Sequence, residues 1–281
     1  MPELPEVETI RRQLEPKLVG QTISNIEILC PKSFCGDPKK IIGKKIISLT
    51  RIGKQLSINL SGNYLILAHF KMTGGLFFQP NKYTRVHIVI ARSNSDEAIP
   101  LGSPRYARDD TNLYFNDLRK FGWLKLFTHK SLKSFQKNLG LDILSPDFTD
   151  KYFYDQLLTS SRPIKNVLLD QTKFAGIGNI YACDSLFASK IKPTISSKNI
   201  SFSKSKLLRH NLQKIMTESI LHGGSTARDR GYIMPDGNSG THQDHFLVYQ
   251  RKGEPCSVCG AIIKAIRQSG RSTFYCPKCQ K

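Results

Sequence analysis

Four cysteines near the end of the 281-residue chain constrain its fold more than any other feature of the sequence. They form two Cys-x2-Cys pairs, Cys256/Cys259 and Cys276/Cys279, with residues 260–275 between them. Each pair predicts a tight knuckle whose two thiolates face one point, and two knuckles together make a closed, tetrahedral zinc site. We therefore expect one structural Zn²⁺ per chain. A redox role is the alternative, but redox pairs normally open a helix in a thioredoxin-like unit.

The chain also carries an excess of positive charge, which restricts its partners. Lysine and arginine number 42 against 22 aspartates and glutamates, a formal net charge of +20, and the basic residues are spread along the whole chain. Such a surface favours a polyanion, with nucleic acid ahead of an anionic membrane. No apolar run approaches the ~20 residues of a membrane span, so we expect no membrane association and a location in the cytoplasm.

Two kinds of hydrophobic periodicity divide the chain before the cysteines. From about residue 22 to 127, apolar and polar residues alternate in short runs, which favours an antiparallel β-sandwich or barrel. From Tyr152 to His222 the period becomes helical, and Pro163 marks the first turn of one helix. The Ser- and Lys-rich stretch 196–206 is expected to be a connection. The sequence thus predicts an α+β multidomain protein. The expected strands are 23–28, 56–60, 64–70, 86–90, 113–115 and 123–127.

The first residues, Met1-Pro2-Glu3, are suited to covalent chemistry. We expect an aminopeptidase to remove Met1 and leave Pro2 with a free secondary amine. Because a terminal amine titrates near ~8, part of it is unprotonated at neutral pH and can attack an electrophilic carbon. Glu3 can donate or accept the proton during that attack. The plainer interpretation is an ordinary chain start whose acidic residues complement the dipole of the helix that follows.

Three turns carry residues suited to binding a nucleic-acid duplex. The turn 176–178 exposes backbone N–H groups at a helix start, where they can hold a phosphate, and Asn179 adds an amide donor. Met72 follows a strand beside a glycine turn, and Arg119 and Phe121 share another turn. Apolar wedges with an arginine can fill the hole in a kinked duplex. The plainer interpretations are helix packing for the glycines and core positions for Met72 and Phe121.

Together these residues resemble the formamidopyrimidine-DNA glycosylase family, whose members are also called 8-oxoguanine DNA glycosylases or abasic-site lyases. The resemblance is carried by P-E-L-P-E-V-E-T at the start, G-I-G-N-I-Y-A in the middle and G-R-S-T-F-Y-C-P in the finger. It implies an N-terminal helix with an antiparallel β-sandwich, a helix–two-turn–helix domain and a C-terminal zinc finger. The expected boundaries are 1–140 for the catalytic β-sandwich domain, 150–224 for the helical DNA-binding domain, 225–245 for a loop over the lesion and 246–281 for the finger.

The resemblance also implies roles for single residues. Pro2 would attack C1′ of the damaged nucleotide and Glu3 would donate a proton, with Lys54 and Arg271 completing the catalytic group. From the sequence alone, Arg271 can enter a groove or bind a phosphate, and the plainer interpretation is a solvated face. The implied DNA contacts are Lys54, Asn179 and Arg271 on phosphates and Met72, Arg119 and Phe121 in the void left by the flipped base. The residues implied for the lesion loop are Thr241, His242 and Gln243.

The implied activity is that of a monomeric, bifunctional repair enzyme. It would excise oxidised purines from duplex DNA through a Schiff base on Pro2 and cleave the strand by β,δ-elimination. Two alternatives stay open: the endonuclease VIII branch, which prefers oxidised pyrimidines, and a non-enzymatic zinc-ribbon DNA-binding protein. Leu4 and the long stretch 225–245 favour the purine branch, and a pure binding protein has no use for a free Pro2 amine. The chain departs from the family pattern at Lys71, Leu118, Lys120, Asp184 and in a longer loop at 94–112.

Overall fold

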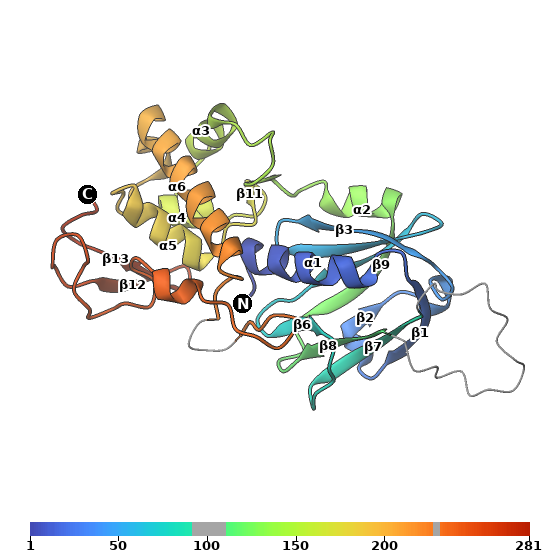
Figure 1. Cartoon of the computed structure of the whole chain (residues 1–281). Coiled ribbons are helices and arrows are strands. Elements are labelled where there is room, and N and C mark those ends of the chain that lie inside the picture. The colour runs from blue at the N-terminus through green and yellow to red at the C-terminus, as the bar shows by residue number, and fades with distance from the viewer. Residues whose placement is uncertain (92–110, 227–230) are drawn as a thin grey trace, which may run out of the picture. The chain divides into compact units, whose positions relative to one another are not determined.

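The computed structural model describes residues 1–91, 111–226 and 231–281 (Figure 1). The loop predicted at 94–112 lies almost entirely outside the described residues. The described chain divides into two compact units, each with its own core. The first unit comprises Met1–Pro2, Glu6–Lys137 and Thr226–Gly240, and the second comprises Glu3–Pro5, Asn138–Ser225 and Thr241–Lys281.

In its described residues, the first unit holds most of α1, which runs from Leu4 to Leu18, together with nine strands and a second helix. Its strands are β1 (Thr22–Ile28), β2 (Phe34–Cys35), β3 (Ile46–Ile52), β4 (Gln55–Leu60), β5 (Tyr64–His69), β6 (Gly74–Phe77), β7 (Thr84–Ala91), β8 (Thr111–Asp117) and β9 (Trp123–Thr128). Helix α2 (His129–Gln136) follows β9, and two short 3-10 turns lie at Pro31–Ser33 and Pro38–Lys40. All six strands expected from the alternating pattern are present.

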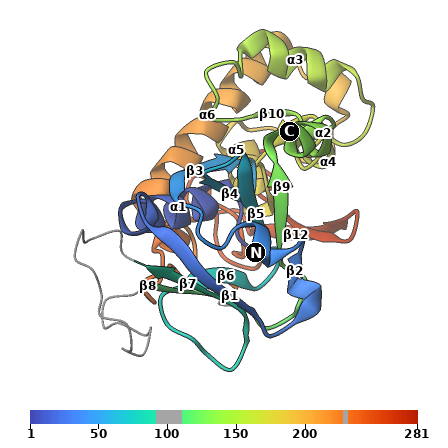
Figure 2. The same ribbon diagram turned by 90° about the vertical axis from the view of Figure 1, so that its right-hand side faces the viewer.

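These strands form two sheets. One has the order β1-β7-β8-β6, and the other has the order β2-β9-β5-β4-β3, in which only β2 and β9 pair in parallel. Figure 2 shows β1, β7, β8 and β6 in one layer and β3, β4, β5 and β9 in the other. Apolar side chains from both sheets and from α1 make one buried cluster, with Ile10, Ile58 and Ile88 among its members. The predicted β-sandwich with an N-terminal helix is confirmed.

The second unit is mainly helical and ends in the cysteine-bearing segment. Its elements are β10 (Leu141–Asp142), α3 (Asp150–Leu158), α4 (Ile164–Leu168), β11 (Phe174–Ala175), α5 (Asn179–Ala188), α6 (Phe202–Leu221), β12 (Lys264–Gln268) and β13 (Arg271–Tyr275), with 3-10 turns η3 (Ser197–Asn199) and η4 (His242–His245). Apolar residues of α3, α4, α5 and α6 form its main core, and Leu4 belongs to this core.

One expected connection proved partly wrong. The Ser- and Lys-rich pattern predicts a connection over 196–206, yet α6 already begins at Phe202. The Ser201 hydroxyl accepts a hydrogen bond from the Lys204 N–H at 3.4 Å and so caps the helix. Ser205 lies completely buried and donates to the Phe202 carbonyl. Serines in this stretch therefore start the helix and do not interrupt it, which is a usual role for serine at an N-cap.

The hairpin between the cysteine pairs has a two-residue turn. Strands β12 and β13 pair in antiparallel register with Gln268 opposite Arg271. The two residues between them, Ser269 and Gly270, have φ of 46° and 79°. Two positive φ angles match the twist of a tight hairpin, so Arg271 follows the turn directly. Among the described helices, none is long and apolar enough to cross a membrane.

Candidate functional site

Glu3 is fixed within the second unit at the start of α5. It is 2% exposed, and its Oε1 accepts a hydrogen bond from the backbone N–H of Ile180 at 3.3 Å. The N-terminus of a helix stabilises a negative charge placed there. Gly178 leaves the space, because a Cβ at this residue would lie 1.9 Å from Glu3 Cδ. Since Pro2 is covalently next to Glu3, this anchor also restrains the residue predicted to be the nucleophile.

Gln171 orders the glycine turn that leads into α5. Its side-chain oxygen accepts from the Gly176 N–H at 3.0 Å, and its amide donates to the Ile177 carbonyl at 2.9 Å. Gly176 has a φ of 102°, and a Cβ there would lie 2.4 Å from a methyl carbon of Leu4. The Leu4 N–H donates to the Gly176 carbonyl at 3.3 Å. The turn therefore requires glycine and holds the residue that follows Glu3.

Asn179 and a buried lysine hold the hairpin that carries Arg271. The Asn179 Nδ2 donates to the Ser272 carbonyl at 3.0 Å. Lys165 is completely buried on α4, and its Nζ donates to Thr273 Oγ1 at 2.6 Å and to the Ser272 carbonyl at 3.2 Å. Burial lowers the pKa of Lys165, with the nearby Arg271 acting in the same direction. Arg271 itself is exposed beside these anchors, so a phosphate can reach it.

Asp184 anchors the segment that enters the finger. It is fully buried on α5 and accepts backbone N–H hydrogen bonds from Leu247, Val248 and Tyr249 at 3.1, 3.0 and 2.9 Å. Burial raises the pKa of Asp184 to about 6, although the three N–H groups act in the opposite sense. Aspartate thus replaces the glutamate of the family pattern at this position, and both of its carboxylate oxygens accept hydrogen bonds.

Asp117 organises the turn that carries Arg119 and Phe121 in the first unit. It is 1% exposed, and its Oδ1 accepts from Thr73 Oγ1 at 2.5 Å and from the Arg119 N–H at 3.1 Å. Its Oδ2 accepts from the Gly122 N–H at 2.7 Å. The same carboxylate therefore joins the turn after β8 to the turn before β6. Hydrogen bonds to a charged group are worth about 1.5–3 kcal/mol each, so this junction is well fixed.

The side chains on these turns project outward. The Arg119 guanidinium lies over the Phe121 ring at 5.1 Å, and Phe121 is 56% exposed. Leu118 is exposed as well, and Met72 is half-buried. The core interpretation of Phe121 is therefore wrong, because a large apolar ring stands in solvent. Its exposure fits a side chain that is buried only when a ligand is bound.

Two departures from the family pattern adopt strained backbone. Lys71 and Lys120 have φ of 53° and 57°, in the left-handed region that favours glycine. The Lys71 N–H donates to His69 Nδ1 at 3.1 Å, which supports its turn. Burial lowers the pKa of His69 to about 3, with Lys71 and Lys54 acting in the same direction, so the ring is a neutral acceptor. His69 is therefore a hydrogen-bonded structural histidine.

Lys54 lies in the turn between β3 and β4. Gly53 before it has a φ of 58°, and the Gly53 carbonyl accepts from Arg51 Nη1 at 3.1 Å. Arg51 also pairs with Glu8 of α1, Nε to Oε2, at 3.4 Å. Lys54 is half-buried and belongs to the same unit as Pro2. The turn is thus tied to the helix that begins near the N-terminus.

The residues predicted for the lesion loop begin the short turn η4. Thr241 is exposed, and its N–H donates to the His222 carbonyl at 3.0 Å. His242 is 2% exposed and packs inside the second unit, whereas Gln243 is half-buried. Earlier in the same stretch, Tyr232 is buried in the core of the first unit.

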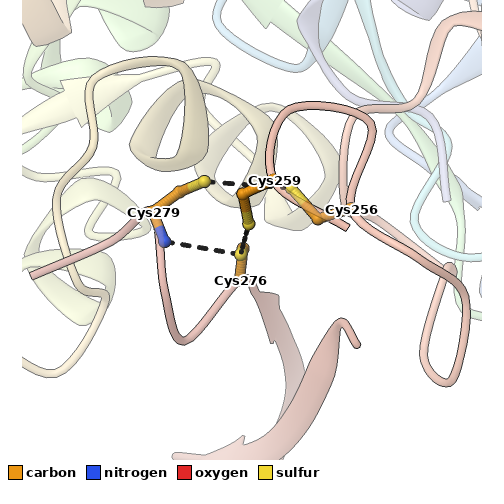
Figure 3. Close-up of side chains that lie close together, drawn as sticks. All are labelled: Cys256, Cys259, Cys276 and Cys279. Carbon is orange, nitrogen blue, oxygen red and sulfur yellow. Dashed lines mark hydrogen bonds between the residues drawn. The ribbon is translucent and has the colours of Figure 1, made fainter. Parts of the chain in front are cut away.

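The four cysteines of the second unit converge as predicted. Their sulfur atoms all lie within 4.8 Å of one another, and Figure 3 shows the side chains of both knuckles turned to one point. The Cys256–Cys279 and Cys259–Cys276 sulfur distances are 3.9 and 3.5 Å. A tetrahedral ion with Zn–S bonds of about 2.3 Å needs sulfurs roughly 3.8 Å apart. The cluster therefore fits one structural Zn²⁺ with four thiolates, which leaves no open position for a substrate.

The residues predicted for the site are divided between the two compact units, and each set is described within its own unit. Within the second unit, Asn179 lies beside the hairpin of Arg271, and Arg119 and Phe121 lie together in the first. The set in the first unit is Pro2, Lys54, Met72, Arg119 and Phe121, and the set in the second is Glu3, Asn179, Thr241, His242, Gln243, Arg271 and the four cysteines.

Sequence reasoning missed three side chains that hold these sets in place: Asp117, Lys165 and Gln171. Asp117 stands beside Arg119 in the turn sequence N-D-L-R-K-F-G, and its position between two polar turns was a usable signal. Lys165 carried none, because a lysine in a short helix is usually a surface residue. Gln171 carried none either.

Three family models match the chain in order. They are the formamidopyrimidine-DNA glycosylase N-terminal domain over residues 1–124, the formamidopyrimidine-DNA glycosylase H2TH domain over 139–230, and the zinc finger found in FPG and IleRS over 253–281. Proteins named formamidopyrimidine-DNA glycosylase from Bartonella quintana and Rickettsia bellii are each 35% identical, and each alignment covers 100% of both chains.

Solved structures are similar over the same length. The MutM (Fpg) protein of Thermus thermophilus superposes with a TM-score of 0.88 at 34% identity and covers 99% of this chain and 98% of its own. A Lactococcus lactis FPG mutant in complex with Fapy-dG containing DNA gives a TM-score of 0.87 at 32% identity, with both chains fully covered. Wild-type Lactococcus lactis FPG with oxidised-pyrimidine DNA gives 0.86 at 32% identity, again with full coverage.

Proposed function

Because the chain belongs to the formamidopyrimidine-DNA glycosylase family of DNA repair glycosylase/lyases, we propose that it excises oxidised purines from duplex DNA and cuts the strand at the resulting abasic site. The proposed substrates are 8-oxoguanine and formamidopyrimidine lesions. The names of the relatives and the Fapy-dG complex of the Lactococcus lactis protein support this choice. The observation that carries it is the Glu3 carboxylate, held at the start of α5 directly beside Pro2 in the chain.

The proposed reaction begins at the N-terminus. After Met1 is removed, Glu3 protonates O4′ of the damaged nucleotide and the sugar ring opens as the C1′–O4′ bond breaks. The Pro2 amine attacks C1′, the base leaves with the electrons of the C1′–N bond and with the proton that the amine gives up, and an iminium remains between Pro2 and C1′. Loss of a C2′ proton then expels the 3′ phosphate, and a second elimination expels the 5′ phosphate. Water releases Pro2 from the remaining fragment.

Binding of the duplex is assigned to basic and projecting side chains of both units. Lys54, Asn179 and Arg271 are proposed to contact phosphates close to the lesion. Arg119 and Phe121, with Met72, are proposed to fill the space that the flipped nucleotide leaves. Extrusion of the nucleotide costs a few kcal/mol of base stacking, and the inserted side chains restore part of that stacking. The exposure of Phe121 and its contact with Arg119 support this role.

Thr241, His242 and Gln243 are proposed to serve the segment over the extruded base, with His242 supporting it from inside. Arg271 and Lys54 are proposed to assist catalysis by holding the phosphates beside C1′. The enzyme is proposed to act as a monomer on damaged double-stranded DNA in the bacterial cytoplasm, in keeping with the bacterial sources of its relatives. The proposed limits of its parts remain 1–140, 150–224, 225–245 and 246–281.

A second substrate class has one observation in its favour. A wild-type Lactococcus lactis relative has been crystallised with DNA that contains an oxidised pyrimidine. An endonuclease VIII-like preference for such lesions is therefore the competing proposal for this chain. Both activities would use the same Pro2 and Glu3, so catalytic residues do not separate them. Only relative rates on the two kinds of lesion do.

The test is single-turnover excision from matched duplexes that carry 8-oxoguanine, an oxidised pyrimidine, a pre-formed abasic site or no lesion. We expect 8-oxoguanine to be removed at least about tenfold faster than the pyrimidine, a difference of about 1.4 kcal/mol in activation free energy. Glu3→Gln should slow excision far more than abasic-site cleavage, while Glu27→Gln, an exposed control, should change neither. Faster removal of the pyrimidine would establish the competing proposal. Binding without cleavage of any duplex would establish a non-enzymatic protein.

A further inference from the structure

Three histidines form a stack in the second unit that the proposed reaction does not use. His222 caps the C-terminal end of α6, and His242 and His245 lie on η4. The His222 and His245 rings are 4.1 Å apart and nearly parallel, at 7°. The His242 ring lies 5.8 and 6.0 Å from the other two, at 24° and 25°. The Nδ1 atoms of His222 and His242 are 3.5 Å apart.

His242 is the buried member of this stack. It is 2% exposed and packs against the rings of Tyr181 on α5 and Phe246 after η4, at 5.9 and 6.1 Å. Among the residues that the structure describes, the ionisable groups that face it are His222 from α6, His245 from its own turn and the Tyr181 phenol. That phenol is hydrogen-bonded to Ser219 Oγ at 2.7 Å, and Asp244 on the same turn is exposed. A proton on His242 would therefore place a positive charge among other imidazoles and apolar rings.

The stack lies where two segments of chain are joined. The Thr241 N–H donates to the His222 carbonyl at 3.0 Å, and the His242 N–H donates to the Gly224 carbonyl at 3.1 Å. Ser225 and Thr241 form an isolated antiparallel bridge. The end of α6 and the start of η4 are thus held together by backbone hydrogen bonds and by the three rings.

We propose that the His242 imidazole, stacked with the rings of His222 and His245, holds η4 on the end of α6 only while it is neutral, and thereby sets the acid limit of base excision. His242 is then a positioning residue for the Thr241–Gln243 segment. The proposal rests on the proposed function, because that segment is assigned to the damaged base.

The direction of the effect follows from the burial of His242. Burial and the two neighbouring imidazoles lower the pKa of His242 to about 4 in the closed state. In an opened state the ring is solvated and titrates near its usual ~6.5. Protons therefore bind the opened state preferentially between these two values, and the closed state loses stability as the pH falls through this window. With these values, opening should rise about 30-fold from about pH 7.5 to about pH 5.

The first test uses the protein alone and does not depend on catalysis. Hydrogen exchange of the Thr241 and His242 amides, corrected for intrinsic exchange, should show this rise of about 30-fold on acidification. His242→Phe keeps an aromatic ring but cannot titrate, so its opening should be almost independent of pH. His210→Phe is the matched control, since His210 is an exposed histidine of α6 outside the stack, and it should behave like wild type. Equal pH dependence in His242→Phe and wild type would overturn the proposal.

The second test compares two substrates in each variant. For wild type and His210→Phe, the ratio of 8-oxoguanine excision at about pH 5 to that at about pH 7.5 should be at least fivefold lower than the same ratio for a pre-formed abasic site. In His242→Phe the two ratios should coincide. Coincident ratios in wild type would overturn the proposed link to excision. Absence of cleavage in every variant would contradict the proposed function instead, and the exchange measurement would still decide the behaviour of the stack.

Discussion

The turn after β8 and the turn before α5 both present residues proposed to hold DNA, yet they are built in opposite ways. In the first, Asp117 fixes the backbone, and the side chains of Arg119 and Phe121 project into solvent. In the second, Asn179 is already hydrogen-bonded to the hairpin beside Arg271. One turn holds its backbone and leaves its side chains unburied, whereas the other fixes side chains and backbone together.

This difference matches what each turn is proposed to do. A phosphate is bound by donors at fixed positions, and donors held in advance lose little conformational entropy on binding. A wedge must enter a space that exists only in the distorted duplex, so it cannot be buried beforehand. The proposed role would therefore account for the exposed aromatic ring of Phe121, and the buried carboxylate of Asp117 holds the turn that carries it.

The largest effect should come from loss of the metal, because the hairpin that carries Arg271 belongs to the finger. Cys276→Ser leaves three thiolates, so the finger should unfold locally and DNA affinity should fall by about 100-fold or more, because structural zinc sites supply folding free energy. Far-ultraviolet circular dichroism should change little, since most helices and strands lie outside the finger. Cys35→Ser, at an exposed cysteine, is the control and should bind normally. Wild-type affinity in Cys276→Ser would contradict the role of the finger.

The next largest effect should come from Asp117, which supports the projecting turn. Asp117→Asn presents an amide to a site that accepts three hydrogen bonds, so it should cost about 1–3 kcal/mol of unfolding free energy and slow excision. Asp37→Asn is the matched change at an exposed residue, where one oxygen accepts from the Lys39 N–H, and it should cost less than about 0.5 kcal/mol. Equal denaturant midpoints for the two variants would show that Asp117 does not fix the turn.

A smaller effect is expected at Lys165, which supports the side-chain anchors. Lys165→Met keeps the stem but removes the hydrogen bonds to Ser272 and Thr273, so DNA affinity should fall by about tenfold, or 1.4 kcal/mol. Asn166→Ala, which removes a more exposed bond to Ser269, should have little effect. If Lys165 acts through Arg271, the two substitutions should not add: Arg271→Ala/Lys165→Met should bind like Arg271→Ala. If the losses of binding free energy in the two single variants add fully in the double variant, Lys165 does not act through Arg271.

The smallest effect is on the salt dependence of binding. Arg271→Ala should lower the log–log slope of affinity against salt by about 0.9, whatever the lesion, because one phosphate contact is lost. Phe121→Ala, on the contrasting turn, should leave this slope unchanged and reduce excision. A slope for Arg271→Ala equal to that of wild type would remove Arg271 from the phosphate contacts.

The sequence predicted the parts of this molecule that follow a regular pattern, namely the strands with alternating apolar residues and the paired cysteines of the metal site. Alternation predicted all the expected strands of the sandwich, and the cysteine spacing predicted the convergence of four sulfurs, because both depend on local pattern. It could not predict Lys165, whose partners lie 107 and 108 residues away in the chain. It misjudged Phe121 as a possible core residue, since exposure of an apolar ring depends on the turn that Asp117 makes. It also placed His242 in a loop over the base, without indicating that the ring packs among two other histidines.

The most direct test of the central claim is to trap the covalent intermediate and find the attached residue. Borohydride added during reaction with 8-oxoguanine duplex should reduce the iminium and yield a stable protein–DNA adduct, and peptide mapping should place the link on the Pro2 nitrogen. Lys54→Ala should still cross-link. Acylation of the terminal amine should abolish cross-linking, because an amide nitrogen is not nucleophilic. An adduct on Lys54 or any other lysine would contradict the account of the N-terminus as the nucleophile.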